Sequence, residues 1–381
     1  MRDHALGHSD YFRNLTGLRG FAALWVFVYH MWAYSEPRLM LVPLGFTTID
    51  LTPLFSTGWA GVDVFFVLSA FLLTLPFAHW ACGERDFPSP GRYLLKRFRR
   101  IFPAFWAQFL ILLVLAATTT FYSVPTFRSF AWQTFMYFNL PPSWVAPLNQ
   151  VWWTLPTEFL FYLLLLPLAL LLKTRTGRVV LVLLMSLAWM YRWWVFQNFH
   201  DEGVGRMVIL MGNTLGCLDQ FIAGTFCAWF FVKHHGRGKL PVPPIVFLGL
   251  GILGMLTAMY SVHWLYDLYW AGHPLMVLKN TLLGVSICSI LIACQSGSRL
   301  ADILFGNRLI VHLGIISYSI YLWHYPLLHM LNQMAFFKDW EGYRLPMVLA
   351  IAVPITWLLS YTSYRWIERP FLKSPTKPKT G

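Results

Sequence analysis

The sequence predicts an all-α membrane protein. Two observations support this prediction, the composition of the chain and the arrangement of its apolar runs. Of 381 residues, 57% are hydrophobic and only 12% are charged, whereas soluble domains carry roughly 25% charged residues. The mean hydropathy is +0.55. Apolar runs of about twenty residues, the length needed to cross a bilayer as a helix, recur along the chain. We therefore expect a bundle of transmembrane helices.

Ten such runs predict ten membrane-spanning helices. They lie near residues 15–34, 59–80, 102–122, 151–172, 178–197, 215–233, 243–262, 276–295, 309–332 and 345–365. The stretch 130–140 is too short to cross and is expected to lie at the membrane interface or to re-enter. An even number of spans places both termini on one side of the membrane.

The positions of Lys and Arg predict which side that is. Of the 29 Lys and Arg, 21 fall at the two termini and in the even-numbered loops, five in the odd-numbered loops and three within the runs. Positive residues favour the cytoplasmic side, so both termini are expected there. The formal charge of +13 comes from residues that cluster in short loops. This placement indicates the orientation of the helices in the membrane and contact with an anionic lipid surface. No nucleic-acid partner is expected.

One membrane domain is expected over residues 1–371, followed by a short basic cytoplasmic tail at 372–381. No internal repeat or linker divides the chain. The five Cys show no C-x-x-C and no metal-ligand spacing, so no metal site is expected. The first apolar run is full length and lacks a signal-peptide cleavage pattern.

Arg19 and His30 form the most informative pair in the sequence. Eleven residues separate them, which places both on one face of a helix about 16 Å apart along its axis. An ionisable residue inside a membrane span indicates a functional site by default. The alternatives are that Arg19 extends to the lipid headgroups and that His30 only bridges two helices.

Asp63, Glu158, Asp219 and His324 are further ionisable residues inside the expected spans. With the termini inside, Asp63, Glu158 and Asp219 belong to the outer half of the membrane, and His324 lies at middle or outer depth. Asp63 also suits a helix N-terminus, and His324 also suits a packed, hydrogen-bonded core position. Glu158 has no partner nearby on its own helix, which favours a functional role.

Arg97 and Arg100 stand at the cytoplasmic mouth of the third expected span, which Pro103 is expected to begin. Their spacing puts them on one helix face, and guanidinium groups bind phosphate through two parallel hydrogen bonds. The pair therefore suits a phosphate site. The alternative is ordinary positive charge at the cytoplasmic end of a span.

Six motifs occur in an order that resembles one protein family. They are Arg19-x10-His30, Gly61-Val62-Asp63-Val64-Phe65-Phe66, Arg97-x2-Arg100-Ile-x-Pro103, Trp153-x4-Glu158-x3-Tyr162, Ser317-Tyr318-Ser319-Ile320-Tyr321-Leu322-x-His324-x-Pro326 and Glu368-x-Pro370. Together they resemble the membrane acyltransferase-3 family, integral-membrane O-acyltransferases that modify bacterial surface polysaccharides. Ala70 and Pro156 depart from the family pattern. The chain resembles the stand-alone members, which have no C-terminal SGNH domain.

The resemblance implies a bacterial inner-membrane enzyme. It would move an acyl group, commonly acetyl, from cytosolic acyl-CoA to a hydroxyl of a glycan or glycolipid, with no tightly bound cofactor and with the lipid bilayer as its surroundings. His30 is the expected general base, and Asp63 or Glu158 would orient it. Arg97 and Arg100 would hold the CoA phosphates, and Arg19 would escort the thioester or anchor its helix. Further candidate site residues are His324, Asp219, Ser69 and Tyr162.

Two alternatives remain open from the sequence. The same chemistry could use a lipid, a peptidoglycan sugar or a small molecule as acceptor. In another functional class, His30, Asp63, Glu158 and Asp219 would form the proton relay of a transporter. Transporters often contain internal repeats, and none is visible here. The sequence indicates no oligomeric state.

Overall fold

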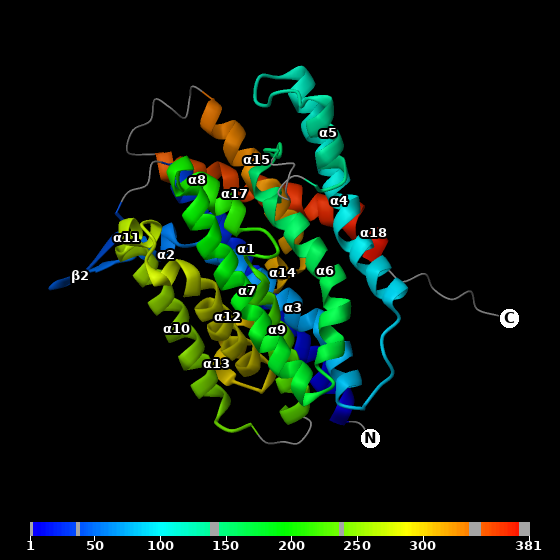
Figure 1. The fold of residues 1–381 in the computed structure, drawn as a ribbon. Helices are drawn as coiled ribbons and strands as arrows, with labels where there is room; N and C mark the ends of the chain where they lie inside the picture. The colour runs from blue at the N-terminus through cyan, green and yellow to red at the C-terminus, as the bar shows by residue number, and fades with distance from the viewer. Residues whose placement is uncertain (1–2, 36–38, 138–144, 236–239, 335–343, 373–381) are drawn as a thin grey trace.

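Helices form nearly all of the regular structure in the computed structural model, which describes residues 3–35, 39–137, 145–235, 240–334 and 344–372 (Figure 1). The long helices are α1 (Asp3–Tyr34), α3 (Ala60–Ala81), α4 (Pro90–Thr118), α6 (Thr154–Leu171), α7 (Arg175–Phe199), α9 (Leu218–His235), α10 (Pro244–Trp264), α12 (Pro274–Gln295), α15 (Ser317–Gln333) and α17 (Arg344–Ser363). Most of the expected basic tail, residues 373–381, lies outside the described residues.

Shorter elements connect the long helices. They are α2 (Thr52–Ser56), α5 (Phe127–Thr134), α8 (Val204–Met211), α11 (Tyr266–Trp270), α13 (Arg299–Phe305), α14 (Arg308–Ile315), α18 (Arg369–Leu372), the 3₁₀ turns η1 (Gln150–Trp153) and η2 (His200–Glu202), and the π turn η3 (Tyr364–Glu368). Strands β1 (Leu41–Leu44) and β2 (Thr47–Asp50) pair antiparallel, with Leu41 opposite Asp50. This hairpin is a small departure from the all-α expectation.

Seven helical segments in the described part of the chain are long and apolar enough to cross a membrane. They are Ala60–Ala81, Pro90–Thr118, Gln150–Leu171, Arg175–Glu202, Pro244–Trp264, Pro274–Gln295 and Arg344–Leu372. Each of the ten predicted runs overlaps at least one helix, but α1, α9 and α15 are not among these seven. The structure thus confirms a multi-pass helical membrane protein, and the number of ten membrane spans stays a prediction.

Two predicted boundaries were wrong. Helix α4 begins at Pro90, which suits the first turn of a helix, and Pro103 lies inside it. Arg97 and Arg100 therefore lie within α4 itself, in the helical setting that their spacing predicted. The run predicted at 309–332 is broken at Ile316, where α14 ends and α15 begins. The short helix α5 (Phe127–Thr134) overlaps the first half of the stretch 130–140 that was judged too short to cross, and residues 138–140 lie outside the described residues.

Helix α1 packs against α3, α14 and α15, while α3 packs against α9 and α10 packs against α12. Close approach to α1 depends on glycine. A Cβ atom at Gly17 would overlap the carbonyl oxygen of Phe305, and one at Gly61 would come within 2.6 Å of the Ala22 carbonyl oxygen. These contacts fix the face of α1 that carries Arg19 and His30.

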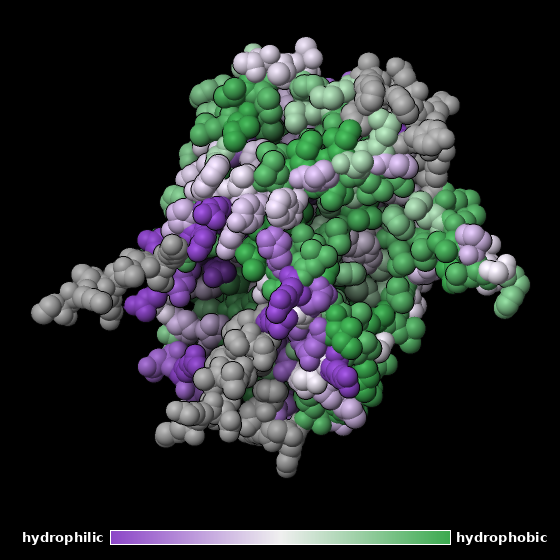
Figure 2. All heavy atoms as spheres, turned by 180° about the vertical axis from the view of Figure 1, so that it is seen from behind, coloured by the Kyte–Doolittle hydropathy of each residue, from purple (hydrophilic) through white to green (hydrophobic). Residues whose placement is uncertain are grey.

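The described connections sort to two ends of the bundle. The start of α1, the loop between α3 and α4 and the turn between α6 and α7 lie at the lower end in Figure 1, whereas α5 lies at the upper end and the hairpin projects sideways. Apolar residues cover much of the face in Figure 2, and hydrophilic residues gather in its lower half around a hollow. An apolar surface with polar residues toward one end suits a protein embedded in lipid.

Candidate active site

A narrow cavity between α1, α3, α4, α6 and α15 gathers the arginines that the sequence singled out. We call it the arginine cavity, and its volume is about 100 Å³. The residues that line it are Arg19, Val62, Phe65, Phe66, Leu68, Ser69, Leu72, Leu73, Arg97, Arg100, Ile101, Thr154, Leu155, Glu158, Tyr162, Ser317, Tyr318 and Tyr321. Ser69 and Tyr162, two of the four further candidates from the sequence, thus lie in the same cavity as the arginines.

The arginines of this cavity differ in their partners. Arg100 Nη1 donates to Glu368 Oε2 at 3.0 Å, and its guanidinium lies 5.6 Å from the centre of the Tyr318 ring. Among the described residues, no carboxylate lies within 4.0 Å of Arg97 or Arg19. Arg97 Nε is buried without a hydrogen-bond partner. Arg97 and Arg19 therefore carry charge that is free to bind an anion.

Glu158 lies on the arginine side of the molecule and not beside His30. It accepts a hydrogen bond from the Ser69 hydroxyl, which joins α6 to α3. Glu158 and Tyr162 are one helical turn apart and both line the arginine cavity. The carboxylate thus adds one negative charge to a cavity that holds three guanidinium groups.

A second and larger cavity contains His30. We call it the histidine cavity, and its volume is about 610 Å³. The polar residues among those lining it are Tyr29, His30, Ser56, Thr57, Asp63, Arg192, His263, Tyr266, Tyr269, Lys279, Asn280 and Tyr321, and its tryptophans are Trp32, Trp59, Trp153 and Trp270. A cavity of this size is in the range that holds small organic ligands.

His30 and His324 form a hydrogen-bonded pair at the edge of this cavity. His324 Nδ1 lies 2.9 Å from the carbonyl oxygen of Ile320. Because a carbonyl only accepts, Nδ1 holds the proton and His324 Nε2 is an acceptor. His324 Nε2 lies 3.1 Å from His30 Nδ1, which is also 2.9 Å from the Val26 carbonyl. His30 Nδ1 therefore donates, and no described residue donates to the lone pair of His30 Nε2.

The two carboxylates expected to orient His30 make other hydrogen bonds. Asp63 lines the histidine cavity, but it accepts from Gln220 Nε2 of α9. Glu158 accepts from Ser69. In the described part of the chain no hydrogen bond joins either carboxylate to His30, and the structure places His324 in that position. Sequence reasoning found both histidines but had no signal that would pair them.

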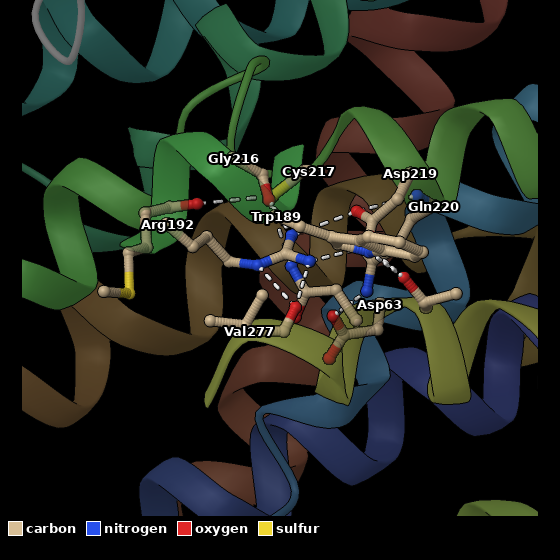
Figure 3. A network of polar contacts seen from close by, with 11 residues as sticks. Asp63, Trp189, Arg192, Gly216, Cys217, Asp219, Gln220 and Val277 are labelled. Atoms are coloured by element: carbon tan, nitrogen blue, oxygen red, sulfur yellow. Dashed lines mark hydrogen bonds and ion pairs between the residues drawn. The ribbon is translucent and has the colours of Figure 1, made fainter. Parts of the chain in front are cut away.

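Asp219 belongs to a buried network that ties three helices together (Figure 3). Arg192 Nη2 donates to Asp219 Oδ2 at 2.7 Å, and Nη1 donates to Oδ1 at 3.1 Å. Arg192 Nε also donates to the Val277 carbonyl at 3.0 Å, and the Thr281 hydroxyl donates to Asp219 Oδ2 at 2.6 Å. This geometry makes Asp219 the counter-ion of Arg192, which counts against its service as a proton carrier.

The two cavities adjoin but are separated by side chains. Val62, Phe66 and Tyr321 line both of them. The Tyr321 hydroxyl is fixed on this wall, since it donates to the Val151 carbonyl at 2.6 Å and lies 2.8 Å from Thr154 Oγ1. A thioester carbonyl that entered between the arginines would meet this wall before it reached His30. The arrangement can thus hold an anionic donor on one side and deprotonate a hydroxyl on the other.

Comparison with known proteins places this chain with acyltransferases. The acyltransferase domain of the acyltransferase-3 family matches residues 12–365. The peptidoglycan O-acetyltransferase OatA of Listeria monocytogenes is 23% identical over 389 residues, which cover 96% of this chain and 56% of that protein. The O-acetyltransferase OatA of Staphylococcus aureus is 27% identical over 399 residues, covering 96% and 58%. The chain thus spans a little over half the length of these relatives. No solved structure matches.

Proposed function

This chain belongs to the acyltransferase-3 family, and we propose that it transfers an acetyl group from acetyl-CoA to a hydroxyl of a cell-wall glycan. Peptidoglycan is the favoured acceptor, because the Listeria relative is named a peptidoglycan O-acetyltransferase. The observation that supports the proposal is the pair of adjoining cavities. One contains Arg19 and Arg97, which have no carboxylate within 4.0 Å among the described residues, and the other contains His30, whose Nε2 makes no hydrogen bond to them. No tightly bound cofactor is needed for this chemistry.

Acetyl-CoA binding uses the arginine cavity. Arg97 and Arg19 have no carboxylate partner among the described residues, so the CoA phosphates supply the negative charge that balances them. Arg100 keeps its ion pair with Glu368 and positions α4 against η3. The nucleotide stays at this mouth, while the narrow cavity admits the pantetheine arm and the thioester.

Transfer uses the histidine pair. His30 Nε2 takes the proton of the acceptor hydroxyl as its oxygen attacks the thioester carbonyl. The C–S bond breaks, and the leaving thiolate of CoA receives that proton from His30. His324 Nε2 accepts the hydrogen bond of His30 Nδ1–H throughout, which holds the ring in the tautomer that can act as a base and stabilises its protonated form.

The wall between the cavities controls contact between donor and acceptor. Phe66 and Tyr321 line both cavities, and an aromatic wall keeps water from the thioester until the acceptor is bound. A shift of these side chains on substrate binding opens the way from the arginines to His30. The reaction therefore runs from one membrane face toward the other.

The membrane arrangement that fits this reaction has ten spans and both termini in the cytoplasm of a bacterial cell. The Lys and Arg distribution supports this orientation, and the start of α1 lies at the same end of the bundle as the loop between α3 and α4 (Figure 1). The arginine cavity then faces the cytosol, where acetyl-CoA is made, and the histidine cavity faces outward.

One experiment separates an acyltransferase from a proton-coupled transporter. Purified protein in nanodiscs, with no ion gradient, is given acetyl-CoA labelled in the acetyl group and peptidoglycan fragments. We expect labelled, base-labile ester on the glycan and free CoA in equal amounts, and at least about 100-fold slower formation of both with His30→Ala. Absence of both products from the unmodified protein would contradict the proposal.

A further inference from the structure

Lys279 is a cation within a predicted membrane span, and it has no role in the reaction proposed above. It lies in the second turn of α12 and lines the histidine cavity. Its ammonium group lies 4.2 Å from the centre of the Trp59 ring, a cation–π distance. A charged side chain at such a position is costly and needs a partner.

Two other cations inside the helix bundle have a carboxylate partner, whereas Lys279 does not have one among the described residues. Arg192 is paired with Asp219, and Arg100 is paired with Glu368. Over the described ranges, no carboxylate oxygen lies within 4.0 Å of the Lys279 ammonium group. Lys279 is thus the cation of the histidine cavity whose charge no ion pair satisfies.

Asp63 balances the charge of this cavity only from a distance. It is 7% exposed and accepts a hydrogen bond from Gln220, which fixes its carboxylate toward α9. Asp63 therefore offsets part of the Lys279 charge through space, while the N–H groups of Lys279 stay available to a ligand.

The walls around Lys279 suit a sugar ring. Trp59, Trp153, Tyr269 and Trp270 line the same cavity, and aromatic faces pack against the apolar C–H faces of sugars while polar groups meet the hydroxyls. Asn280, next to Lys279 in the chain, also lines this cavity, and its amide nitrogen donates to the Gly216 carbonyl at 3.3 Å. A sugar seated there would have its hydroxyls within a cavity that also contains His30.

We infer that Lys279 binds a carboxylate on the acceptor, so that the histidine cavity takes an acidic sugar in preference to its neutral counterpart. The inference rests on the proposed function, because it names the substrate class of that same cavity. Like Arg97 and Arg19 in the arginine cavity, Lys279 has no carboxylate partner among the described residues, and an anionic group of the substrate would balance its charge.

The test measures binding and not turnover. The probes are a disaccharide of N-acetylated sugars that carries one free carboxylate, and the same disaccharide with that carboxylate converted to an amide. Equilibrium dialysis against protein in nanodiscs gives the Kd of each. We expect the acidic form to bind at least about tenfold more tightly, since a charge-assisted hydrogen bond contributes on that scale.

The variants separate charge from packing. Lys279→Gln should bind both forms alike, and Lys279→Arg should keep the preference. Lys233→Gln is the matched control, because Lys233 lies 4.7 Å from the Trp229 ring but does not line the cavity; it should bind as the unmodified protein does. A preference that persists in Lys279→Gln would overturn the inference, as would unmodified protein that binds both forms equally or binds neither.

A parallel assay keeps this result distinct from the proposed function. The same preparations are tested for transfer of labelled acetyl from acetyl-CoA to the acidic disaccharide. A charge preference without any transfer would overturn the acetyltransferase proposal and leave the Lys279 site standing. Transfer of acetyl without a preference for the acidic disaccharide would overturn the Lys279 site and leave the acetyltransferase proposal standing.

Discussion

His324 Nε2 lies 3.1 Å from His30 Nδ1, although 294 positions separate the two residues in the chain. Each ring is also held by a carbonyl one helical turn before it, that of Val26 for His30 and that of Ile320 for His324. Two helices, α1 and α15, thus fix the tautomers of two imidazoles at the edge of one cavity. His30 Nε2 is the nitrogen of this pair that remains able to accept a proton.

Replacing His30 with Ala should lower the rate of acetyl transfer by about 10²–10⁴-fold, the range that a general base contributes. His30 is only partly buried, so the protein should still insert and fold. Transfer of labelled acetyl to peptidoglycan fragments measures the effect, with acetyl-CoA binding as the control. A variant with the unmodified rate would rule out His30 as the base.

His324 is a positioning residue in this scheme, and its substitutions should separate accordingly. His324→Leu removes the acceptor of the His30 Nδ1–H bond and should lower kcat by about tenfold or more with KM for acetyl-CoA unchanged. His324→Gln offers an amide oxygen in its place and should recover part of the loss. Equal activity of the two variants would show that the hydrogen bond does not matter.

Arg97 and Arg100 should respond differently to substitution by Ala. Arg97 has no carboxylate partner among the described residues, so Arg97→Ala should raise KM for acetyl-CoA by about 10–100-fold with little change in stability. Arg97→Lys should recover only part, since Lys cannot bind phosphate through two parallel bonds. Binding of CoA as tight as in the unmodified protein would make Arg97 a topological charge only.

Arg100→Ala should act on stability, because it leaves Glu368 buried and unpaired, with its side chain 1% exposed. Loss of one partner of a buried pair costs about 3–5 kcal/mol. Thermal unfolding in detergent measures this, and Glu368→Gln together with Arg100→Ala should be less harmful than Arg100→Ala alone. A melting temperature equal to that of the unmodified protein would contradict the structural role.

The Arg192–Asp219 pair should behave as a structural clamp (Figure 3). Asp219→Leu leaves Arg192 buried without its counter-ion and should cost about 3–5 kcal/mol of unfolding free energy. Adding Arg192→Met should recover part of that loss. If Asp219 instead carried protons for transport, Asp219→Asn would abolish function without changing the melting temperature.

Cysteine labelling tests the membrane orientation. Phe98 on α4 is 40% exposed, and Phe46 at the tip of the hairpin is fully exposed, with α3 between them in the chain. In a background without native cysteines, Phe98→Cys should react only from the cytoplasm and Phe46→Cys only from outside. Thr57, between the hairpin and α3, is unsuitable for labelling because it is buried. Labelling of both from one side would contradict a crossing by α3.

The sequence by itself determined the class of the protein and the residues worth testing. Composition and run length predicted a helical membrane protein, because burial in lipid requires long apolar segments whatever their packing. The ordered motifs, from Arg19-x10-His30 to Glu368-x-Pro370, were enough to identify the family. The apolar runs and the motifs are both local features of the chain. Spacing along one helix, for example, determines which residues share a face of that helix.

Only the tertiary structure decided which of those residues meet. Glu158 joined the arginines, Asp63 turned to Gln220, Asp219 paired with Arg192, and His324 took the place beside His30. The rotation of one helix against another depends on close packing, as at Gly17 against Phe305 and Gly61 against Ala22. No periodicity within a single helix contains that information, so the partners of His30 could be read only from the packed bundle.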